Sequence, residues 1–496
     1  MLEISQFSFS YANDQDEGVE NISFHVNKGE CVLLCGKSGC GKTTMVRAIN
    51  GLIPYFYDGK REGEVLLDGQ AVESREMYEL SELTGTVFQN PRSQFFNVDT
   101  DSEIVFGMEN MAYPREKMEE RMQQVTKELH LEKLRKRNIF HLSGGEKQKI
   151  AFSSVYAVSP EVFVLDEPSS NLDAEAIEEL KDMIALLKRQ GKTIIISEHR
   201  IYYLRDLIDK AIVLNRGRVM SVYTREAFLR LTDQDRQQMG LRALELNKVR
   251  FSHHDKPEPR NRDPLHELVM RDVAVSHNKK KVLQGIQLTA KSGEIIAVTG
   301  HNGAGKTTFA RALCGVHKIA SGSIDFNGQK LTAKKQAGLA YMVMQDVNYQ
   351  LFAETVEKEC AFGVKNADPH AVWRALEHME LAAFATRHPN TLSGGQKQRL
   401  AVAASIISKK EILVFDEPTS GLDFGSMHNV ASILRGLAAA NKIIFVITHD
   451  LEFIASCCTR IVRLGTGGMQ EDYLLNEENE QRTIHYFANY KAKAER

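Results

Sequence analysis

GKSGCGKTT at residues 36–44 recurs as GHNGAGKTT at residues 300–308. Each copy ends a short apolar run, GECVLLCG or GEIIAVTG, that is typical of a buried strand. A glycine-rich loop between a strand and a helix turns its backbone N–H groups toward one point, where phosphate binds at the helix N-terminus. The pattern therefore predicts two phosphate-binding loops. Their expected residues are Gly36, Gly39, Gly41, Lys42, Thr43 and Thr44 in the first copy and Gly300, Gly303, Gly305, Lys306, Thr307 and Thr308 in the second.

A second repeated segment brings two acidic residues to the end of an apolar run. It reads VFVLDEPSSNLD at residues 162–173 and ILVFDEPTSGLD at residues 412–423. An aspartate suits the coordination shell of Mg²⁺, together with the hydroxyls of Thr43 and Thr307. A glutamate beside a phosphate site suits the polarisation of an attacking water. We therefore expect metal binding by Asp166 and Asp416 and catalysis by Glu167 and Glu417.

Two further positions recur near these loops. His199 and His449 follow the next apolar runs, KTIIIS and KIIFVI, and are expected to contact the γ-phosphate or the attacking water. Gln89 and Gln345 follow TVF and MVM, and are expected to bind Mg²⁺ and the attacking water. Both copies retain every one of these side chains, so the sequence predicts two hydrolytic sites.

The repeat extends over most of the 496 residues, which indicates a duplicated domain. Strand-like runs alternate with helical spacing, such as the apolar positions of residues 174–191, and this alternation predicts an α/β fold with a mostly parallel core sheet. We expect the first domain at residues 1–224, a linker at 225–264 containing Pro257, Pro259 and Pro264, a second domain at 265–480 and a tail at 481–496.

Composition excludes several classes of protein. The formal net charge is −2, which gives no support for nucleic-acid binding. No run approaches the roughly 18 apolar residues of a membrane-spanning helix, and the N-terminus lacks the pattern of a secretory signal. The odd number of cysteines, seven, without metal-ligand spacing, is typical of reduced thiols in a cytosolic protein.

The segments LSGGE at residues 142–146 and LSGGQ at 392–396 complete a pattern that resembles the ATP-binding subunits of ABC transporters. The resemblance covers nearly the whole chain. It implies two tandem P-loop NTPase domains, each with a helical subdomain that carries the LSGG motif. It also implies ATP and Mg²⁺ as cofactors, and intramolecular pairing of the two domains as a head-to-tail sandwich.

In such a sandwich each ATP lies between the phosphate loop of one domain and the LSGG segment of the other. Lys42 would then face Ser393, Gly394 and Gly395, and Lys306 would face Ser143, Gly144 and Gly145. Asp173 and Asp423 match the loop that communicates between the sites, and Tyr11 matches the aromatic residue that stacks on adenine. The equivalent residue in the second copy is His277, which departs from this pattern.

The segments after the two glutamines resemble those of energy-coupling factor ATPases, which drive the uptake of vitamins or transition-metal ions. They read VFQNPRSQFFNVDTDSEIVFG and VMQDVNYQLFAETVEKECAFG. The resemblance implies a peripheral protein at the cytoplasmic face of the cell membrane, with a membrane T-component and a substrate-binding S-component as partners. Gln94, Phe95, Gln350 and Phe352 are expected near the groove for the T-component, although the phenylalanines also suit a hydrophobic core.

Two alternatives remain open. A soluble ribosome-acting ATPase of the ABC-F type would also carry two ATP-binding domains, but it usually has a longer, charged helical linker. A tandem ATPase of a sugar-type importer fits the segments after the glutamines less well.

Overall fold

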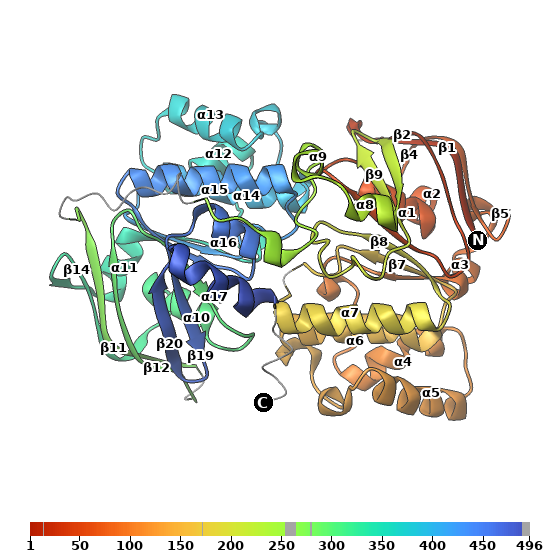
Figure 1. Ribbon diagram of the computed structural model, residues 1–496, viewed down its shortest axis with the longest axis horizontal. Helices are drawn as coiled ribbons and strands as arrows, with labels where there is room; N and C mark the ends of the chain where they lie inside the picture. Colours follow the sequence, from red (N-terminus) through yellow and green to blue (C-terminus); the bar gives the residue numbers. More distant parts are fainter. Residues whose placement is uncertain (13, 171, 253–263, 278–279, 489–496) are drawn as a thin grey trace. The chain divides into compact units, whose positions relative to one another are not determined.

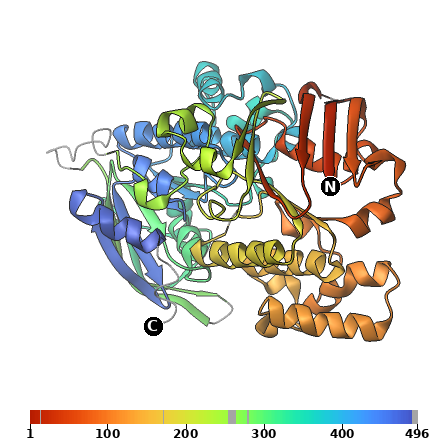
Figure 2. The same ribbon diagram turned by 45° about the vertical axis from the view of Figure 1, so that its right-hand side comes forward.

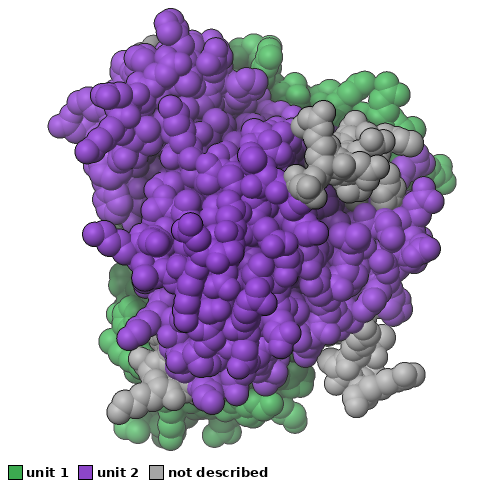
Figure 3. Space-filling view, turned by 90° about the vertical axis from the view of Figure 1, so that its left-hand side faces the viewer, with its two compact units in different colours: residues 1–244 green, residues 245–496 purple. Residues whose placement is uncertain are grey.

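The structure is a computed structural model that describes all residues except 13, 171, 253–263, 278–279 and 489–496. The chain forms two compact units, Met1–Leu244 and Glu245–Arg496, coloured separately in Figure 3. Both units combine a mainly parallel sheet with helices, which confirms the expected duplicated α/β domain.

The first unit is built around a sheet of six strands. In spatial order these are β10 (Arg218–Thr224), β9 (Lys210–Asn215), β3 (Cys31–Gly36), β8 (Thr193–Ser197), β7 (Val162–Asp166) and β6 (Thr84–Val87). Only the β9/β10 pair is antiparallel among these strands. Because β3, β7 and β8 are buried along their whole length, they are continuous apolar runs, as buried parallel strands usually are.

The second unit repeats this arrangement. Its sheet has the order β16 (Ala340–Val343), β17 (Ile412–Asp416), β18 (Ile443–Ile447), β13 (Ile295–Thr299), β19 (Arg460–Gly465) and β20 (Gly468–Leu474). Within this sheet the β19/β20 pair is the antiparallel one. The carboxyl ends of the central strands therefore meet at one edge of the sheet in each unit, and the repeated motifs follow these ends.

Each unit also carries a smaller antiparallel sheet. Its strands are β2 (Asp14–Val26), β1 (Leu2–Tyr11), β4 (Gly59–Leu67) and β5 (Gln70–Ala71) in the first unit, and β12 (Lys280–Lys291), β11 (Glu267–His277), β14 (Ile319–Phe326) and β15 (Gln329–Lys330) in the second. Helices connect the strands: α1 (Lys42–Ile49), α2 (Leu52–Tyr55), α3 (Met77–Leu83) and α7 (Ala174–Arg189), then α10 (Lys306–Leu313), α11 (Ala333–Leu339), α15 (Phe424–Ala439) and α16 (Leu451–Cys457).

A helical subdomain follows β6 in the first unit and β16 in the second. It comprises α4 (Thr100–Asn110), α5 (Arg115–Glu128) and α6 (Gly144–Val158), and in the second unit α12 (Val356–Cys360), α13 (Pro369–His378) and α14 (Gly394–Ile407). Figures 1 and 2 show α4 and α5 gathered on the side of the first unit away from its antiparallel strands. The LSGG segments lie at the N-termini of α6 and α14, which confirms their expected place in a helical subdomain.

The stretch expected as a linker is divided between the units. Helices α8 (Arg225–Leu229) and α9 (Asp233–Gln238) belong to the first unit, where Phe228 is fully buried. Residues 245–252 belong to the second unit, where Phe251 packs against the core. The proline-rich residues 253–263 lie outside the described residues. The expected tail begins inside α17 (Glu477–Ala488), whose Ile484 and Phe487 are buried.

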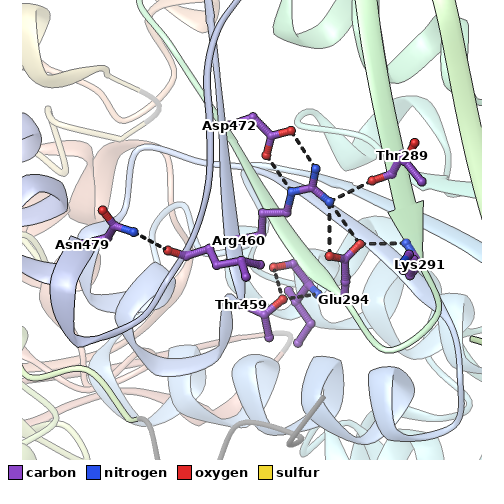
Figure 4. A network of polar contacts seen from close by, with 9 residues as sticks. Thr289, Lys291, Glu294, Thr459, Arg460, Asp472 and Asn479 are labelled. Carbon is purple, nitrogen blue, oxygen red and sulfur yellow. Dashed lines mark hydrogen bonds and ion pairs between the residues drawn. The ribbon is translucent and has the colours of Figure 1, made fainter. Parts of the chain in front are cut away.

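Arg460 joins three strands of the second unit through its guanidinium group (Figure 4). It makes two bonds of 2.6 Å to Asp472 on β20, one of 2.8 Å to the Thr289 carbonyl on β12, and a 3.2 Å contact with Glu294 just before β13. The equivalent residue of the first unit, Lys210, bonds Glu30 and the His25 carbonyl in the same places. The planar, forked donor set of arginine allows the additional contact with β20.

Within the residues that the structure describes, we find no helix that is long and apolar enough to cross a membrane.

Candidate functional site

The phosphate-binding loops have the backbone that their glycines predict. Gly36 has φ 139° and Gly300 has φ 141°, and a Cβ atom at either position would overlap a carbonyl oxygen, that of Leu214 or Leu464. Gly41 and Gly305 immediately precede α1 and α10 with φ 102° and 93°. Only glycine adopts such conformations readily. Both loops therefore present an open helix N-terminus with positive electrostatic character.

The lysine of each loop is buried and folded back over its own loop. Lys42 Nζ lies 3.4 Å from the Gly36 carbonyl oxygen and 3.2 Å from His199 Nε2. Lys306 Nζ donates to the carbonyl oxygen of Gly300 at 2.7 Å. A lysine in this position is available to bind phosphate oxygens as a compact point charge.

Four of the predicted residues meet in the first unit. Glu167 Oε2 accepts a bond of 2.7 Å from Gln89 Nε2, and Glu167 Oε1 lies 3.4 Å from His199 Nε2, which in turn contacts Lys42. Glu167 follows β7 with φ 45°, and its backbone N–H donates to the Ser197 carbonyl at the end of β8. The left-handed backbone at this position directs the side chain away from the strand and toward the cluster.

The second unit forms a related cluster with different distances. Glu417 Oε1 lies 3.8 Å from His449 Nε2, and Thr448 Oγ1 contacts Glu417 Oε2 at 3.4 Å. Thr307 Oγ1 donates to Asp416 Oδ2 at 3.0 Å, which directly joins two of the three predicted metal ligands of this unit. Gln345 is exposed just after β16.

The buried carboxyl groups have shifted pKa values. Burial raises the pKa of Asp166 to about 6, and the charge of the adjacent Glu167 contributes to this rise. Burial also favours a higher pKa for Glu167, but the nearby charges of His199 and Lys42 outweigh it and hold that pKa below its usual value. Burial raises the pKa of Asp416 against the opposing bond from Thr307.

The carboxylates fit a divalent cation. Asp166 Oδ1 is buried and has no hydrogen-bond partner within the described part of the chain. A buried oxygen without a partner is costly, and a hard cation such as Mg²⁺ would satisfy it. Thr43 lies exposed on the first turn of α1, and its counterpart Thr307 already bonds to Asp416. The oxygen-only donor set is the one that Mg²⁺ prefers.

The aromatic residue expected at adenine is held by polar contacts. The hydroxyl of Tyr11 lies 3.2 Å from Thr44 Oγ1 and accepts a bond of 2.9 Å from Arg47. The Tyr57 ring meets the Tyr11 ring edge-on at 5.9 Å. His277 is the last residue of β11, and its side chain lies outside the description. Thr308 occupies the place of Thr44 on α10.

The LSGG segments begin helices through reciprocal caps. Ser143 Oγ accepts from the N–H of Glu146, whose carboxylate accepts from the N–H of Ser143 at 2.7 Å. Ser393 and Gln396 form the same pair in the second unit. Each cap leaves its two glycines, Gly144 and Gly145 or Gly394 and Gly395, in the first helical turn. Asp173 and Asp423 cap helices too, α7 and α15.

In each unit an aromatic pair with at least one exposed phenylalanine was only partly identified from the sequence. The Phe96 side chain is 76% exposed and stacks on Phe106 at 4.9 Å, while Phe95, the residue singled out from sequence, packs against the core. In the second unit the expected Phe352 is 68% exposed and lies 6.2 Å from Phe362. Aligning the repeat at its glutamines, which pairs Phe96 with Phe352, would have identified the exposed residue.

The two glutamines expected near this surface, Gln94 and Gln350, bond the backbone of their own segments. Gln94 accepts from the Phe88 N–H and donates to the Thr86 carbonyl, and Gln350 accepts from the Met344 N–H at 2.6 Å. They fasten the segments that follow β6 and β16, and so support the aromatic residues that come next. We call Phe96 with Phe106, and Phe352 with Phe362, the aromatic platforms.

Known proteins resemble this chain over almost its whole length. Residues 19–170 and 283–420 match the family model described as "ABC transporter". A putative ABC transporter ATP-binding protein of Treponema denticola is 47% identical over 97% of this chain and 98% of its own length. The putative HMP/thiamine import ATP-binding protein YkoD of Bacillus subtilis is 31% identical over 95% of this chain and 91% of its own.

Solved structures share the fold. A model of ribosome-bound archaeal Pelota and ABCE1 contains a chain that matches 97% of this one, and 80% of its own length, with a TM-score of 0.70 at 22% identity. The RNase-L inhibitor matches 97% of this chain and 92% of its own with a TM-score of 0.63 at 22% identity. At this identity the likeness shows the fold alone. Domains of the matched family bind ATP with Mg²⁺ and hydrolyse it. The chain belongs to the ABC transporter family, as an ATPase with two ATP-binding domains.

Proposed function

We propose that this ATPase energises a membrane importer of the energy-coupling factor type, from the cytoplasmic face of the membrane. The observation that carries the proposal is the pair of aromatic platforms, one in each unit, in which Phe96 and Phe352 are exposed in the segments that follow the predicted catalytic glutamines. Large exposed aromatic side chains next to each other are typical of protein contact surfaces.

The platforms are built by the same device in both units. Glu103 is 2% exposed and accepts bonds from the N–H groups of Phe96 and Asn97 at 3.1 and 2.8 Å. Glu359 accepts from the N–H groups of Phe352 and Ala353, both at 2.6 Å. A buried carboxylate with two charge-assisted bonds holds the backbone rigidly, so that the phenylalanine is presented to solvent in a fixed position. Both units would thus receive similar apolar segments of a membrane partner.

The hydrolytic chemistry follows from the cluster around each glutamate. Glu167 and Glu417 polarise the attacking water, while His199 and His449 contact the γ-phosphate from the end of the neighbouring strand. Lys42 and Lys306 bind the β- and γ-phosphates. Asp166, Thr43 and Gln89 in the first unit, and Asp416, Thr307 and Gln345 in the second, would hold Mg²⁺, which would supply positive charge to the phosphates. Positioning and charge stabilisation account for most catalysis of phosphoryl transfer.

In the proposed arrangement each loop would complete its site with the LSGG segment of the other unit. The backbone N–H groups of Gly144 and Gly145, and of Gly394 and Gly395, lie in first helical turns and are suited to a γ-phosphate. ATP would bind the closed arrangement more tightly than the open one, so that binding drives closure and hydrolysis permits reopening. Asp173 and Asp423 would carry the signal between the sites, and Tyr11 and His277 would contact adenine.

The imported compound is proposed to be a vitamin or a transition-metal ion. The B. subtilis relative bears the name of an HMP/thiamine import protein, which supports a vitamin. A membrane T-component would rest on the aromatic platforms, and a separate S-component would select the substrate.

Purification of the tagged chain from gently solubilised native membranes tests this function. We expect small, very hydrophobic membrane proteins to accompany it, and the Phe96→Ser/Phe352→Ser variant to lose them while it keeps basal ATPase activity. Tyr78→Ser is the matched control, because Tyr78 is 66% exposed on α3, outside the platforms. Retention of the partners by the double variant would contradict the platform, and ribosomal subunits without a membrane protein would contradict the importer.

A further inference from the structure

The two units support their histidines with different residues at equivalent positions. From the acidic motif onward the repeat keeps a constant offset, so that Glu198, His199 and Arg200 correspond to Thr448, His449 and Asp450. In the second unit a carboxylate, Asp450, directly follows the histidine. In the first unit a carboxylate, Glu198, directly precedes it. Both carboxylates are almost fully buried: Glu198 is 2% exposed and Asp450 is 4% exposed.

In the second unit Asp450 ties the histidine segment to the loop after the catalytic glutamate. Its Oδ2 atom accepts a bond of 2.8 Å from the hydroxyl of Thr419, two residues after Glu417. Its Oδ1 atom accepts from the Phe453 N–H at 3.2 Å and so caps α16. One carboxylate therefore holds both the loop and the start of the next helix.

In the first unit Glu198 makes the same connection through four bonds. Its Oε1 atom accepts from the Ser169 N–H at 2.9 Å and from the Tyr203 hydroxyl at 3.0 Å. Its Oε2 atom accepts from the N–H groups of His199 and Arg200 at 2.7 and 3.0 Å. Ser169 stands two residues after Glu167, as Thr419 does after Glu417. Glu198 thus fixes the backbone of His199 and the loop of Glu167 together.

Neighbouring residues also differ between the units, in agreement with the different positions of the two carboxylates. Tyr203 supplies a hydroxyl to Glu198, whereas its counterpart Phe453 supplies a backbone N–H to Asp450. Arg200 cannot cap a helix as Asp450 does, and residues 202–207 form turns where the second unit has α16. Arg200 instead donates to the Leu172 carbonyl at 3.1 Å, next to Asp173.

We propose that Glu198 is a positioning residue of the first ATP site, with the task that Asp450 has in the second. The inference rests on the proposed role of His199. Glu198 bonds the backbone of His199 and not its ring. It acts by holding the His199 imidazole, through that backbone, within reach of Glu167 and Lys42. Loss of this restraint impairs the chemical step and leaves ATP binding intact.

Glu198→Gln is the sharpest variant, because it keeps the shape of the side chain. Its amide NH₂ group must face either the Ser169 and Tyr203 donors or the His199 and Arg200 donors, so one pair loses its acceptor. We expect kcat to fall about twofold if the two sites work independently and about tenfold or more if they are coupled, with KM for MgATP unchanged. Glu20→Gln, an exposed glutamate paired with Arg218, is the control and should leave both constants unchanged.

Hydrogen exchange of the nucleotide-free protein provides a readout that does not depend on activity. In Glu198→Gln we expect faster exchange in the peptides that carry Ser169 and His199, and unchanged exchange in the rest of the first unit. A rescue variant, Glu198→Thr/Arg200→Asp, transfers the arrangement of the second unit. It should recover kcat and slow exchange relative to Glu198→Thr alone, because the introduced carboxylate could accept from the Ser169 hydroxyl.

Three results would overturn the positioning role: unchanged local exchange in Glu198→Gln, faster exchange throughout the unit, or no recovery in the rescue variant. Failure of the underlying role of His199 would appear separately. In that case His199→Ala would retain wild-type turnover, while Glu198→Gln would still loosen the two peptides.

Discussion

Glu167, proposed as the catalytic base of the first unit, stands in a cluster that favours its negative charge. His199 and Lys42 hold the pKa of Glu167 below its usual value although burial opposes them. Glu167 also receives a bond from Gln89, so the ionised side chain is oriented as well as stabilised. A carboxylate kept ionised and oriented next to a phosphate loop can accept a hydrogen bond from the attacking water.

Replacing both glutamates by glutamine should abolish turnover and retain ATP. Glu167→Gln/Glu417→Gln keeps the size of each side chain but removes its charge, so that water is no longer polarised. We expect kcat to fall by about 10² or more, with ATP binding preserved. Steady-state hydrolysis and the nucleotide retained after gel filtration measure the two quantities. Unchanged turnover would exclude these residues as the catalytic base.

Asp166 predicts a pH dependence of stability. Its pKa of about 6 in the folded chain exceeds the ordinary value of 3.8, so the folded state binds the proton more tightly than the unfolded state. The ionised group therefore opposes folding at neutral pH by about 3 kcal/mol at most, and this cost disappears as pH falls through 6 toward 4. Asp166→Asn should stabilise the nucleotide-free protein at pH 7.5.

Differential scanning calorimetry between pH 5 and pH 7.5, at constant ionic strength, tests this expectation. Because other groups titrate in the same range, the informative quantity is the difference between the wild-type and Asp166→Asn curves. That difference should shrink as the pH falls. Two parallel curves would mean that Asp166 does not titrate as its burial indicates.

At the scale of elements, the sequence predicts regular segments better than the connections between them. Helix α7 lies where the spacing of Ile177, Leu180, Ile184 and Leu187 places it, and Gly191 follows its end with φ 73°. The buried strands that precede the motifs can be predicted equally well from the sequence, because parallel strands covered on both faces are uninterrupted apolar runs.

Other elements could not be predicted because their causes are tertiary. Residues 202–207 and α16 follow equivalent strands, but only α16 is a helix. The carboxylates Glu198 and Asp450 stand two positions apart in the repeat, and only Asp450 is placed to cap a helix. The position of Phe96 depends on a bond from its own N–H to Glu103, which lies on α4, and no pattern around the phenylalanine marks that bond. In the same way, no local pattern showed that α8 and α9 pack on the first unit.

Arg460 should contribute more to stability than a surface ion pair. Its partners Glu294 and Asp472 have side chains only 19% and 26% exposed, so removal of the guanidinium leaves two poorly solvated carboxylates. We expect Arg460→Ala to lower the free energy of unfolding of the second unit by about 2 kcal/mol. Arg460→Lys should lower the free energy of unfolding by about half as much, because lysine cannot form the forked contact.

The chain offers a selective probe for this measurement. Its single tryptophan, Trp373, lies on α13 of the second unit, so tryptophan fluorescence in guanidinium chloride reports that unit. Arg271→Ala is the control, since Arg271 forms an ion pair with Asp325 in the same unit while its own side chain is 69% exposed. An equal effect of the two alanine variants would contradict a special role for Arg460.

For the whole molecule, the duplication gives the two units the same set of motifs. Each unit holds a phosphate loop at the edge of its parallel sheet and an LSGG segment at a helix N-terminus in its helical subdomain. If loops pair with the segments of the other unit, every ATP contacts both units. Binding energy can then be used to bring the units together, which a site within one unit could not do.

The pairing predicts which combinations of variants remove one nucleotide and which remove both. Gly394→Asp and Gly144→Asp place a carboxylate in the first turn of α14 or α6. That charge favours the helix but repels a phosphate, and a Cβ atom at Gly394 meets no other atom within 4 Å. In the Glu167→Gln/Glu417→Gln background, Lys42→Ala should reduce the retained ATP to about half, since it disables one of two sites.

Adding Gly394→Asp to Lys42→Ala should then cause no further loss, because both residues serve the same site. Adding Gly144→Asp should remove the remaining ATP, because it disables the site of Lys306. Retained nucleotide after gel filtration distinguishes the two double variants, and far-UV circular dichroism shows whether the helices remain. If each loop used the LSGG segment of its own unit, the two results would be exchanged, so the experiment decides between a site shared by the units and a site within each.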